Sequence, residues 1–405
     1  MRPDHVLRSR IRLVVAAGVS ISAHVAVAES LHPDPQRLGA AFYGDPPDAA
    51  HPWGVHDRNR PQPEVVSTAG AVTIPPPSDA VVLFNGKDLS RWELERPKPG
   101  KEWVIHDETM ECVPGAGSIR TKEKIGDCQL HIEWAAPSLV KGEGQGRGNS
   151  GVFLMGLTEV QILDNFENSS YPDGSAGAVY GVNPPMKNAL QPPGEFNSYD
   201  IVFRRPIFQD GKQVDPGYLT VFCNGVLIQD HTPLEGGGGH RKRSKPTEFP
   251  ESGPLKLQNH GNAVRFRNIW YRSLPPRAVE GGTSGALEPQ VTSGLRQEIA
   301  AALRGDALSL RGGDGLREFY RSLESLVYAP DASMLARSKE LSTAYLAVVE
   351  NTAREEREKH KKAVLEMRRC LSYMVKHGRV DADFPARRKV DALIEEMDWD
   401  PEKKQ

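Results

Sequence analysis

Short apolar runs separated by turn residues fill the chain between residues 80 and 274. In the clearest runs apolar and polar residues alternate with a period of two, which is the pattern of a β-strand that buries one face. Asn224-Gly225 between two such runs is the signature of a two-residue β-hairpin. Many short strands of this kind predict a sandwich of antiparallel sheets. The predicted strands cover residues 81–84, 103–106, 109–113, 129–135, 151–155, 159–163, 197–204, 218–223, 226–228, 255–258 and 264–272.

Two of these strands carry acids and amides on one face. Strand 159–163 places Glu159 and Gln161 opposite its apolar residues, and strand 129–135 places Glu133 in the same way. Carboxylates and amides along one face of a sheet are suited to binding sugar hydroxyls. If both polar faces lie on the same side, the three side chains form one binding surface. The alternative is a solvent-exposed outer face.

A helical period replaces this pattern near the C-terminus. Residues 331–376 are predicted to form one long helix, with i,i+4 pairs of opposite charge between residues 350 and 362. Gly378 is a plausible stop signal, and residues 386–397 are predicted as a further helix. We therefore predict a helical region over 295–405, as a small bundle or a stalk, which carries no catalytic motif and is able to bind another protein.

The N-terminal residues have the composition of targeting and linker segments. Residues 1–28 contain a basic stretch, an apolar run and a small-x-small site at Ala26 to Ala28, as in a secretory signal peptide. We predict that the protein is secreted or periplasmic and has no stable membrane span beyond this segment. The alternative is that the segment is an uncleaved anchor. Residues 29–78, rich in Pro, Asp and Gly, are predicted to form a flexible linker, and 276–294 a second linker.

The near-neutral net charge argues against nucleic acid as a partner. The chain has 51 Lys and Arg against 53 Asp and Glu, a formal net charge of -2, so no general field attracts nucleic acid. The glycine-rich basic run 236–245 is interpreted as a solvated surface loop. Four cysteines leave disulfide pairing open: Cys112 and Cys128 lie on neighbouring predicted strands and could pair, and free buried thiols are the alternative.

Three further residues could carry chemistry. His260 lies just before the last predicted strand, where an imidazole serves as a base, an acid or a metal ligand, or else bonds to the backbone. Asp164 follows Glu159 by five positions and would share its face only if a β-bulge intervened. Arg265 is placed to contact substrate or to pair with an acid at the sheet edge. The long segment 165–195 has no strand pattern, and such loops are often functional.

Seven segments stand in a fixed order along the predicted β domain, 79–275. They are 83–92 (LFNGKDLSRW), 133–134 (EW), 148–151 (GNSG), 159–164 (EVQILD), 178–181 (AVYG), 194–197 (GEFN) and 258–270 (QNHGNAVRFRNIW). Together they resemble one known family, the 3-keto-disaccharide hydrolases, whose members are also described as 3-keto-glucoside lyases and 3-keto-2-hydroxy-glucal hydratases. The resemblance covers residues 79 to 274.

This resemblance implies a mainly β fold, a concanavalin A-like jelly roll of two antiparallel sheets with a concave sugar-binding face. The α-helical C-terminal segment lies outside it. Two positions depart from the family pattern: Phe196 stands where Trp is usual, and Asn259 stands where Asp is common. The first loses an indole N–H, and the second puts in doubt any role of that acid in tuning His260 or in binding a metal.

The chemistry that the resemblance implies is elimination and hydration of a 3-keto-glycoside, with net hydrolysis of the glycosidic bond. It needs a base, an acid and donors to an enolate. We expect His260, Glu133 and Asp164 to supply base, acid and metal ligation, with their roles left open. The candidates for holding hydroxyls or the enolate are Asn149, Glu159, Gln161, Tyr180 and Arg265. A divalent metal ion would suit these ligands, although no residue spacing requires one.

Two alternatives remain open from sequence. A jelly roll serves equally as a non-catalytic carbohydrate-binding module, because fold does not decide function. A retaining glycosidase with Glu159 and Asp164 as its two carboxylates is the other; it would need the carboxyls about 5 Å apart. Convergence of Glu133, Asp164 and His260 in one pocket is expected of the enzyme, and scattered acids beside aromatic rings are expected of the binding module.

Overall fold

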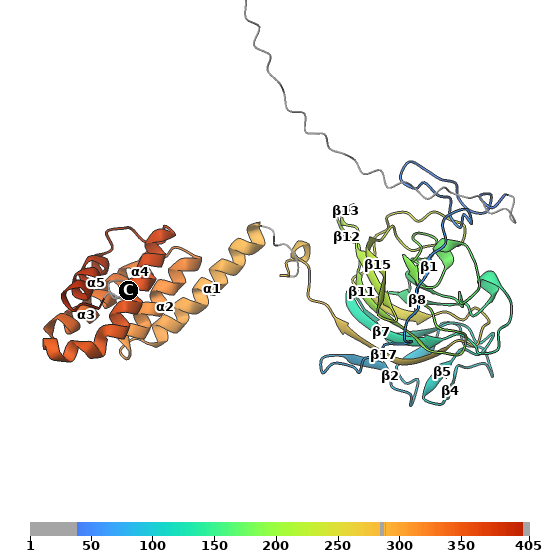
Figure 1. Ribbon diagram of the computed structural model, residues 1–405, viewed down its shortest axis with the longest axis horizontal. Coiled ribbons are helices and arrows are strands. Elements are labelled where there is room, and N and C mark those ends of the chain that lie inside the picture. The colour runs from blue at the N-terminus through green and yellow to red at the C-terminus, as the bar shows by residue number, and fades with distance from the viewer. Residues whose placement is uncertain (1–38, 284–286, 288, 400–405) are drawn as a thin grey trace, which may run out of the picture. The chain divides into compact units, whose positions relative to one another are not determined.

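The computed structural model describes residues 39–283, 287 and 289–399. The chain divides into two compact units, with the boundary between Leu274 and Pro275. Strands make up the first unit and helices α1 to α5 the second (Figure 1). The predicted signal peptide, residues 1–28, lies outside the described residues. None of the described helices is both long and apolar enough to cross a bilayer.

Two antiparallel sheets form the first unit. The larger runs β15 (Val226–Pro233), β14 (Tyr218–Cys223), β11 (Asn197–Arg204), β7 (Cys128–Ala135), β17 (Arg265–Ser273), β5 (Thr109–Glu111) and β4 (Val104–His106), with β2 (Val81–Phe84) also paired to β17. The smaller runs β3 (Trp92–Leu94), β6 (Ile119–Ile125), β16 (Gly253–Leu257), β8 (Ser150–Leu154) and β9 (Thr158–Ile162). Two short pairs complete the set: β1 (Glu64–Val65) with β10 (Lys187–Asn188), and β12 (Ile207–Gln209) with β13 (Lys212–Asp215).

One hydrophobic core lies between the two main sheets. Ile132 and Phe266 from the larger sheet and Val160 and Leu257 from the smaller belong to the same buried cluster. Because side chains alternate along a strand, the polar residues between these core positions point away from the core on both sheets. The predicted fold class, a jelly-roll sandwich of antiparallel sheets with a separate helical C-terminal segment, is confirmed.

Residues 39–78, which we call the N-terminal strap, correct the linker prediction over the part of 29–78 that the structure describes. Val55 and His56 are buried, and β1 pairs in parallel with β10. The carbonyl of Ile74 accepts hydrogen bonds from Asn268 and Trp270 of β17. A proline-rich chain without periodicity is thus held by a few docked side chains and backbone bonds, which composition does not report.

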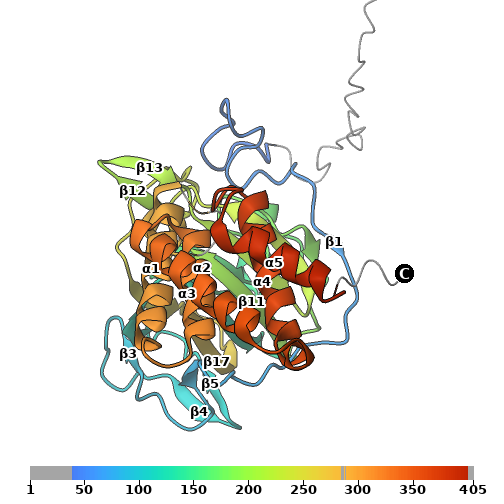
Figure 2. The same cartoon turned by 90° about the vertical axis from the view of Figure 1, so that its left-hand side faces the viewer.

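The second unit is a bundle of five helices with its own core. The helices are α1 (Pro289–Ser309), α2 (Gly315–Tyr328), α3 (Ala332–Asn351), α4 (Lys361–Lys376) and α5 (Pro385–Glu396). Helix α2 packs on α1 and α3, and α5 packs on α3 and α4 (Figures 1 and 2). Helix α1 begins inside the segment 276–294 that composition predicts to be a linker.

The prediction of a single helix over 331–376 is wrong. Helix α3 ends at Asn351, and a 3-10 segment, Arg354–His360, separates it from α4. Arg357 donates to the carbonyls of Glu350 and Thr352 and so satisfies groups at the end of α3. Helix α4 ends at Lys376, followed by Gly378 at φ 62°, as the stop signal predicted.

Candidate functional site

A cavity of 380 Å³ opens on the polar face of the smaller sheet. We call it the sheet cavity. Glu159 and Gln161 of β9 point into it, because Val160 and Ile162 between and beside them belong to the core. Its walls come from the strap, from the loop after β9 and from the basic run 236–245. The lining residues are Tyr43, Gln145, Asn149, Glu159, Gln161, Tyr171, Tyr180, Gly238, Gly239, His240, Gln258 and His260.

The floor of the sheet cavity depends on a glycine. In the β8–β9 hairpin Gly151 pairs with Gln161 and Phe153 pairs with Glu159. A Cβ built on Gly151 would lie 2.1 Å from Oε1 of Glu159, so only glycine leaves room for the carboxyl group. The outer edge of β9 is covered by the following loop, since Tyr180 N donates to the carbonyl of Glu159 and Gly177 N to that of Gln161.

Glu159 is a buried acid whose chemistry is changed by its surroundings. The residue is 7% exposed. Burial raises the pKa of its carboxyl to about 8, against the opposing attraction of Lys256. At neutral pH the carboxyl is therefore mostly protonated and can donate a proton, as a general acid must.

Gln161 presents an unsatisfied acceptor. Its amide nitrogen donates to Gln145 Oε1 at 3.1 Å and to the carbonyl of Gly174 at 3.3 Å. Its oxygen is buried and has no hydrogen-bond partner within the part of the chain that the structure describes. Buried polar atoms rarely stay unpaired, so this oxygen is free to accept a hydrogen bond from a water or from a ligand hydroxyl. Asn149, whose amide nitrogen bonds to Gln145, lies beside it.

A cluster of aromatic rings forms the opposite wall. Tyr180 Oη lies 2.9 Å from Tyr171 Oη and 3.2 Å from Nδ1 of His240. His56 stacks on Tyr171 with ring centroids 3.9 Å apart, and its Nδ1 lies 3.1 Å from Oδ1 of the buried Asp173. The strap thus fixes Tyr171, which in turn fixes Tyr180.

Burial sets the protonation of this wall. Burial raises the pKa of Tyr180 to about 12, so its hydroxyl stays protonated and can donate. Burial also lowers the pKa of His240, as do the neighbouring charges of His56, Arg241 and His260. At neutral pH the His240 imidazole is neutral and can accept a proton. The cavity therefore holds a proton donor and a proton acceptor together.

Five of the sequence-predicted site residues meet in the sheet cavity: Asn149, Glu159, Gln161, Tyr180 and His260. His260 is exposed at its rim. Asn259, the departure from the family pattern, shapes this rim: its amide nitrogen donates to Val113 O at 2.7 Å, and its oxygen accepts from Gly261 N at 3.0 Å.

Glu133 does not line the sheet cavity, and its place among the catalytic residues stays a prediction. It points away from the core on the larger sheet, whereas Glu159 points away from the core on the smaller one, so the sandwich separates them. Arg267 Nε donates to Glu133 at 2.7 Å and Asn268 Nδ2 at 2.9 Å. Although burial opposes it, hydrogen bonds from His131, Asn268 and Arg267 lower the pKa of Glu133 to about 2. Its environment is that of a structural ion pair.

Arg265 also lies on the outer face of the larger sheet. It donates to the carbonyl of Gly194 at 2.9 Å, and its guanidinium lies 5.3 Å from the ring centroid of Phe196. Phe196 packs closer to Arg267, at 3.9 Å. The Phe-for-Trp departure therefore lies outside the sheet cavity, and Arg265 is not one of its lining residues.

Asp164 follows the end of β9 and lines a neighbouring cavity of 630 Å³, which we call the loop cavity. Arg147 Nε donates to Asp164 at 2.6 Å, and the Phe166 amide donates at 3.2 Å. No bulge turns Asp164 toward Glu159. His260 borders both cavities and connects them.

Sequence reasoning missed Tyr43, His56, Tyr171 and His240. The first two lie in the segment predicted to be a linker, and His240 lies in the run predicted to be a solvated loop. The sequence feature that could have identified His240 is the run of glycines that precedes it. In the structure a Cβ built on Gly238 would lie 1.8 Å from the carbonyl oxygen of Tyr180. These glycines permit close approach to the cavity wall.

No group of three or more His, Cys, Asp or Glu side chains that could hold a metal ion exists among the described residues. The divalent ion stays a prediction. All four cysteines are free thiols, and Cys112, Cys128 and Cys223 are buried.

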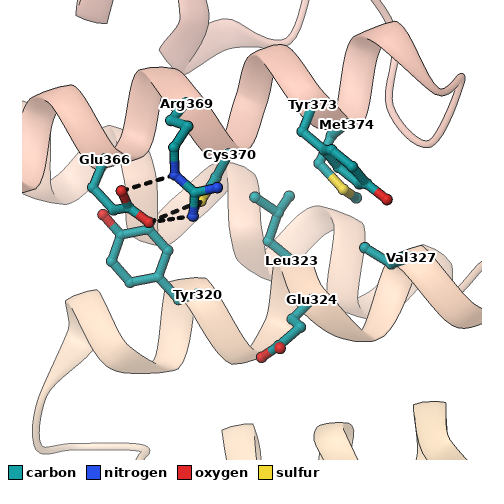
Figure 3. A pocket seen from close by; sticks show the side chains of 9 residues that line it. All are labelled: Tyr320, Leu323, Glu324, Val327, Glu366, Arg369, Cys370, Tyr373 and Met374. Atoms are coloured by element: carbon teal, nitrogen blue, oxygen red, sulfur yellow. Dashed lines mark hydrogen bonds and ion pairs between the residues drawn. The ribbon is translucent and has the colours of Figure 1, made fainter.

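The helical unit has a cavity of its own, of 330 Å³, between α2 and α4 (Figure 3). Tyr320, Leu323 and Val327 line it from α2, and Tyr373 and Met374 from α4. The charged pair on its wall, Arg369 and Glu366, is bonded internally (Figure 3). The cavity contains no acid–base constellation comparable to that of the sheet cavity.

Comparison with known proteins identifies the family of the strand unit. Residues 79–272 match the model of the 3-keto-alpha-glucoside-1,2-lyase-like domain. A solved "putative glycosyl hydrolase" from Parabacteroides distasonis ATCC 8503 is 40% identical, with 53% of this chain and 93% of that chain covered and a TM-score of 0.48. A second protein of the same description and organism is 20% identical, with coverage of 48% and 94% and a TM-score of 0.36. No curated protein matches. On the family model and the 40% identity, the chain belongs to the 3-keto-alpha-glucoside-1,2-lyase-like family.

Proposed function

We propose that this protein cleaves the glycosidic bond of 3-keto-glycosides by elimination followed by hydration. Its family makes it a carbohydrate-active domain. The observation that carries the finer proposal is the protonated, buried Glu159 in one cavity with a neutral His240. Elimination next to a ketone requires such a donor and acceptor in a single site.

Water is the only reactant that the reaction needs besides the 3-keto-glycoside. A ketone at C3 acidifies the proton on C2, and a base removes it. The resulting enolate expels the oxygen at C1 together with a proton from an acid. Water then adds across the C1–C2 double bond of the product. The sum is hydrolysis of the glycosidic bond.

His240 is our candidate for the base. Its lowered pKa leaves the imidazole unprotonated at neutral pH, and Tyr180 lies 3.2 Å from its Nδ1. A base whose pKa lies below the working pH is available without prior deprotonation. Tyr180, held by Tyr171, is a donor for the enolate oxygen.

Glu159 and His260 are the candidates for the acid side of the reaction. Glu159 carries a proton at neutral pH and lies on the cavity floor. His260 borders both cavities, so it lies beside a bond that crosses from one to the other. Asn149, Gln161 and Gln258 are the amides that would hold hydroxyl groups.

A non-catalytic carbohydrate-binding module is the second candidate. Two observations support it. The rings of Tyr43, Tyr171 and Tyr180 are of the kind that commonly bind sugar faces. Glu133 does not converge with Asp164 and His260, which is the arrangement expected of a binding module. A two-carboxylate glycosidase has less support. Of its two acids only Glu159 lines the sheet cavity, whereas Asp164 is ion-paired with Arg147 in the loop cavity.

Incubation with 3-keto-trehalose and with methyl 3-keto-glucoside tests the proposal. We expect release of the leaving alcohol and a transient unsaturated sugar from both, with unmodified trehalose left intact. A parallel incubation with a chelator shows whether a divalent ion takes part. Saturable binding without release under any metal condition would favour the binding module instead.

Localisation and partners are proposed on sequence alone. Export to the periplasm or medium rests on residues 1–28, and fractionation with N-terminal sequencing tests it. A protein partner for the helical unit remains a proposal without an assigned surface.

A further inference from the structure

The loop cavity adjoins the sheet cavity but differs from it in chemistry. It is formed by the loop after β7 and by the turn after β16, and His260 is common to both cavities. Its volume of 630 Å³ exceeds the 380 Å³ of the sheet cavity. A substrate in the sheet cavity that extends past His260 therefore enters the loop cavity.

The loop cavity presents aliphatic side chains to solvent. Leu139 is 66% exposed and Val140 is 47% exposed, and Pro114 and Pro137 stand beside them. The imidazole of His260 is the one aromatic ring among the described residues that line it. Exposed aliphatic residues gathered at a cavity mark a place where an apolar group is covered.

Two of the charged residues that line the loop cavity, Asp164 and Arg147, are paired with each other, and Lys141 is a third. Asp164 accepts from Arg147 Nε, and Arg147 also donates to the carbonyl of Phe166 at 2.9 Å. The sheet cavity, by contrast, offers four amides and a tyrosine wall. Sugar rings need convergent polar groups, whereas an apolar group needs area shielded from water.

We propose that the loop cavity binds the leaving group and selects an apolar aglycone over a second sugar. This inference rests on the proposed function, because it assigns the two cavities to the two sides of the bond that is cleaved. The oxidised sugar lies over Glu159 and Gln161, the scissile oxygen lies near His260, and the aglycone lies on Leu139 and Val140.

The test compares two substrates whose leaving alcohols have similar acidity, methyl and cyclohexylmethyl 3-keto-glucoside. Their intrinsic reactivity is then similar, and the difference reports contact with the aglycone. We expect kcat/KM to be at least about tenfold higher for the cyclohexylmethyl substrate, the scale of a few buried methylene groups.

The double variant Leu139→Ser with Val140→Ser should reduce that ratio by about tenfold, through a lower kcat/KM for the cyclohexylmethyl substrate. Val214→Ser is the matched control, because Val214 is 45% exposed on β13 and lines neither cavity. Both variants are surface changes, and circular dichroism confirms that they fold.

Equal kcat/KM for the two substrates, or a ratio that the double variant leaves unchanged, would overturn the inference. Absence of turnover on both substrates would count against the proposed function instead. Calorimetric binding of the same pair then decides the inference: a cyclohexylmethyl preference that the double variant removes supports it, and equal affinities overturn it.

Discussion

Glu159 is an acid that the fold holds in its protonated form. Its folded pKa of about 8 lies well above the ordinary value of 4.5. The unfolded chain therefore loses this proton at lower pH than the folded chain. The contribution of this carboxyl to the free energy of unfolding is greatest below pH 4.5 and decreases as pH rises toward 8. At pH 7 about 3 kcal/mol of this contribution has been lost.

Replacing Glu159 by Gln tests this directly. Because the amide does not titrate, Glu159→Gln should stabilise the protein by about 3 kcal/mol at pH 7 and by much less at pH 5. It should lower kcat/KM by about 100-fold, since the proton donor is lost. Urea unfolding at the two pH values and rates on methyl 3-keto-glucoside provide the measurements. Glu93→Gln, a surface acid on β3, is the control. Equal stabilisation at both pH values would contradict the raised pKa.

Glu133 shows the opposite shift and the opposite role. Its folded pKa of about 2 lies below the ordinary 4.5. The carboxylate therefore adds to the free energy of unfolding above pH 4.5, and this contribution is lost as pH falls through 2. We expect Glu133→Gln to destabilise the protein by about 3 kcal/mol at pH 7, because Arg267 and Asn268 lose a charged acceptor.

The rate separates this structural role of Glu133 from a catalytic one. The kcat/KM of folded Glu133→Gln on methyl 3-keto-glucoside should stay within about twofold of the unaltered protein, because the sandwich separates Glu133 from the sheet cavity. Asp79→Asn, which removes a surface pair with Arg272, is the control and should change stability much less. A large rate loss with unchanged stability would restore Glu133 to the catalytic set.

At the scale of elements, the N-terminal strap is part of the site. It contributes Tyr43 and His56 to the wall that holds Tyr171. The family match begins only at residue 79, so the strap lies outside the matched domain. The sheet cavity is therefore lined both by residues of the matched domain and by Tyr43 of the strap outside it.

Truncation of the strap gives a third prediction. A chain starting at residue 61 keeps Ile74 and its bonds to β17 but lacks Tyr43 and His56. We expect it to fold and to lose at least about tenfold in kcat/KM, and His56→Ala alone to do the same. His106→Ala, at an exposed position on β4, is the control. Full activity without residues 39–60 would show that the strap is dispensable.

The sequence did not predict strand β6, because charged residues interrupt its apolar positions. Strand β6 (Ile119–Ile125) carries Arg120, Lys122 and Lys124 on its outer face, so its few apolar residues gave no run. The break between α3 and α4 was not predicted, for a different reason. It depends on Arg357 reaching the end of α3, a contact that local charge spacing does not predict.

The whole molecule consists of two units with separate cores. The cluster in the strand unit and the cluster in the helical unit share no residue. All sheet-cavity residues belong to the strand unit. Separate cores are expected to fold separately.

Removal of the helices tests this independence. A chain that ends at Thr283, after the short turn Ala278–Glu280, should fold and retain kcat/KM within about twofold. Thermal unfolding of the full chain should then show one transition that survives the truncation. Aggregation, or a loss above tenfold, would mean that the helices support the site.

The sequence by itself determined the sandwich, the polar face of β9 and the family. Strand periodicity and ordered motifs are local, and they place Asn149, Glu159, Gln161, Tyr180 and His260 on suitable elements. Which polar faces meet was decided only by tertiary structure. Glu133 and Glu159 have the same local pattern, yet they lie on opposite sides of one core, because strand alternation fixes a face without saying which sheet carries it. The surroundings of each acid, likewise, were decided by tertiary structure: burial made Glu159 a proton donor, whereas hydrogen bonds from Arg267 and Asn268 made Glu133 half of an ion pair.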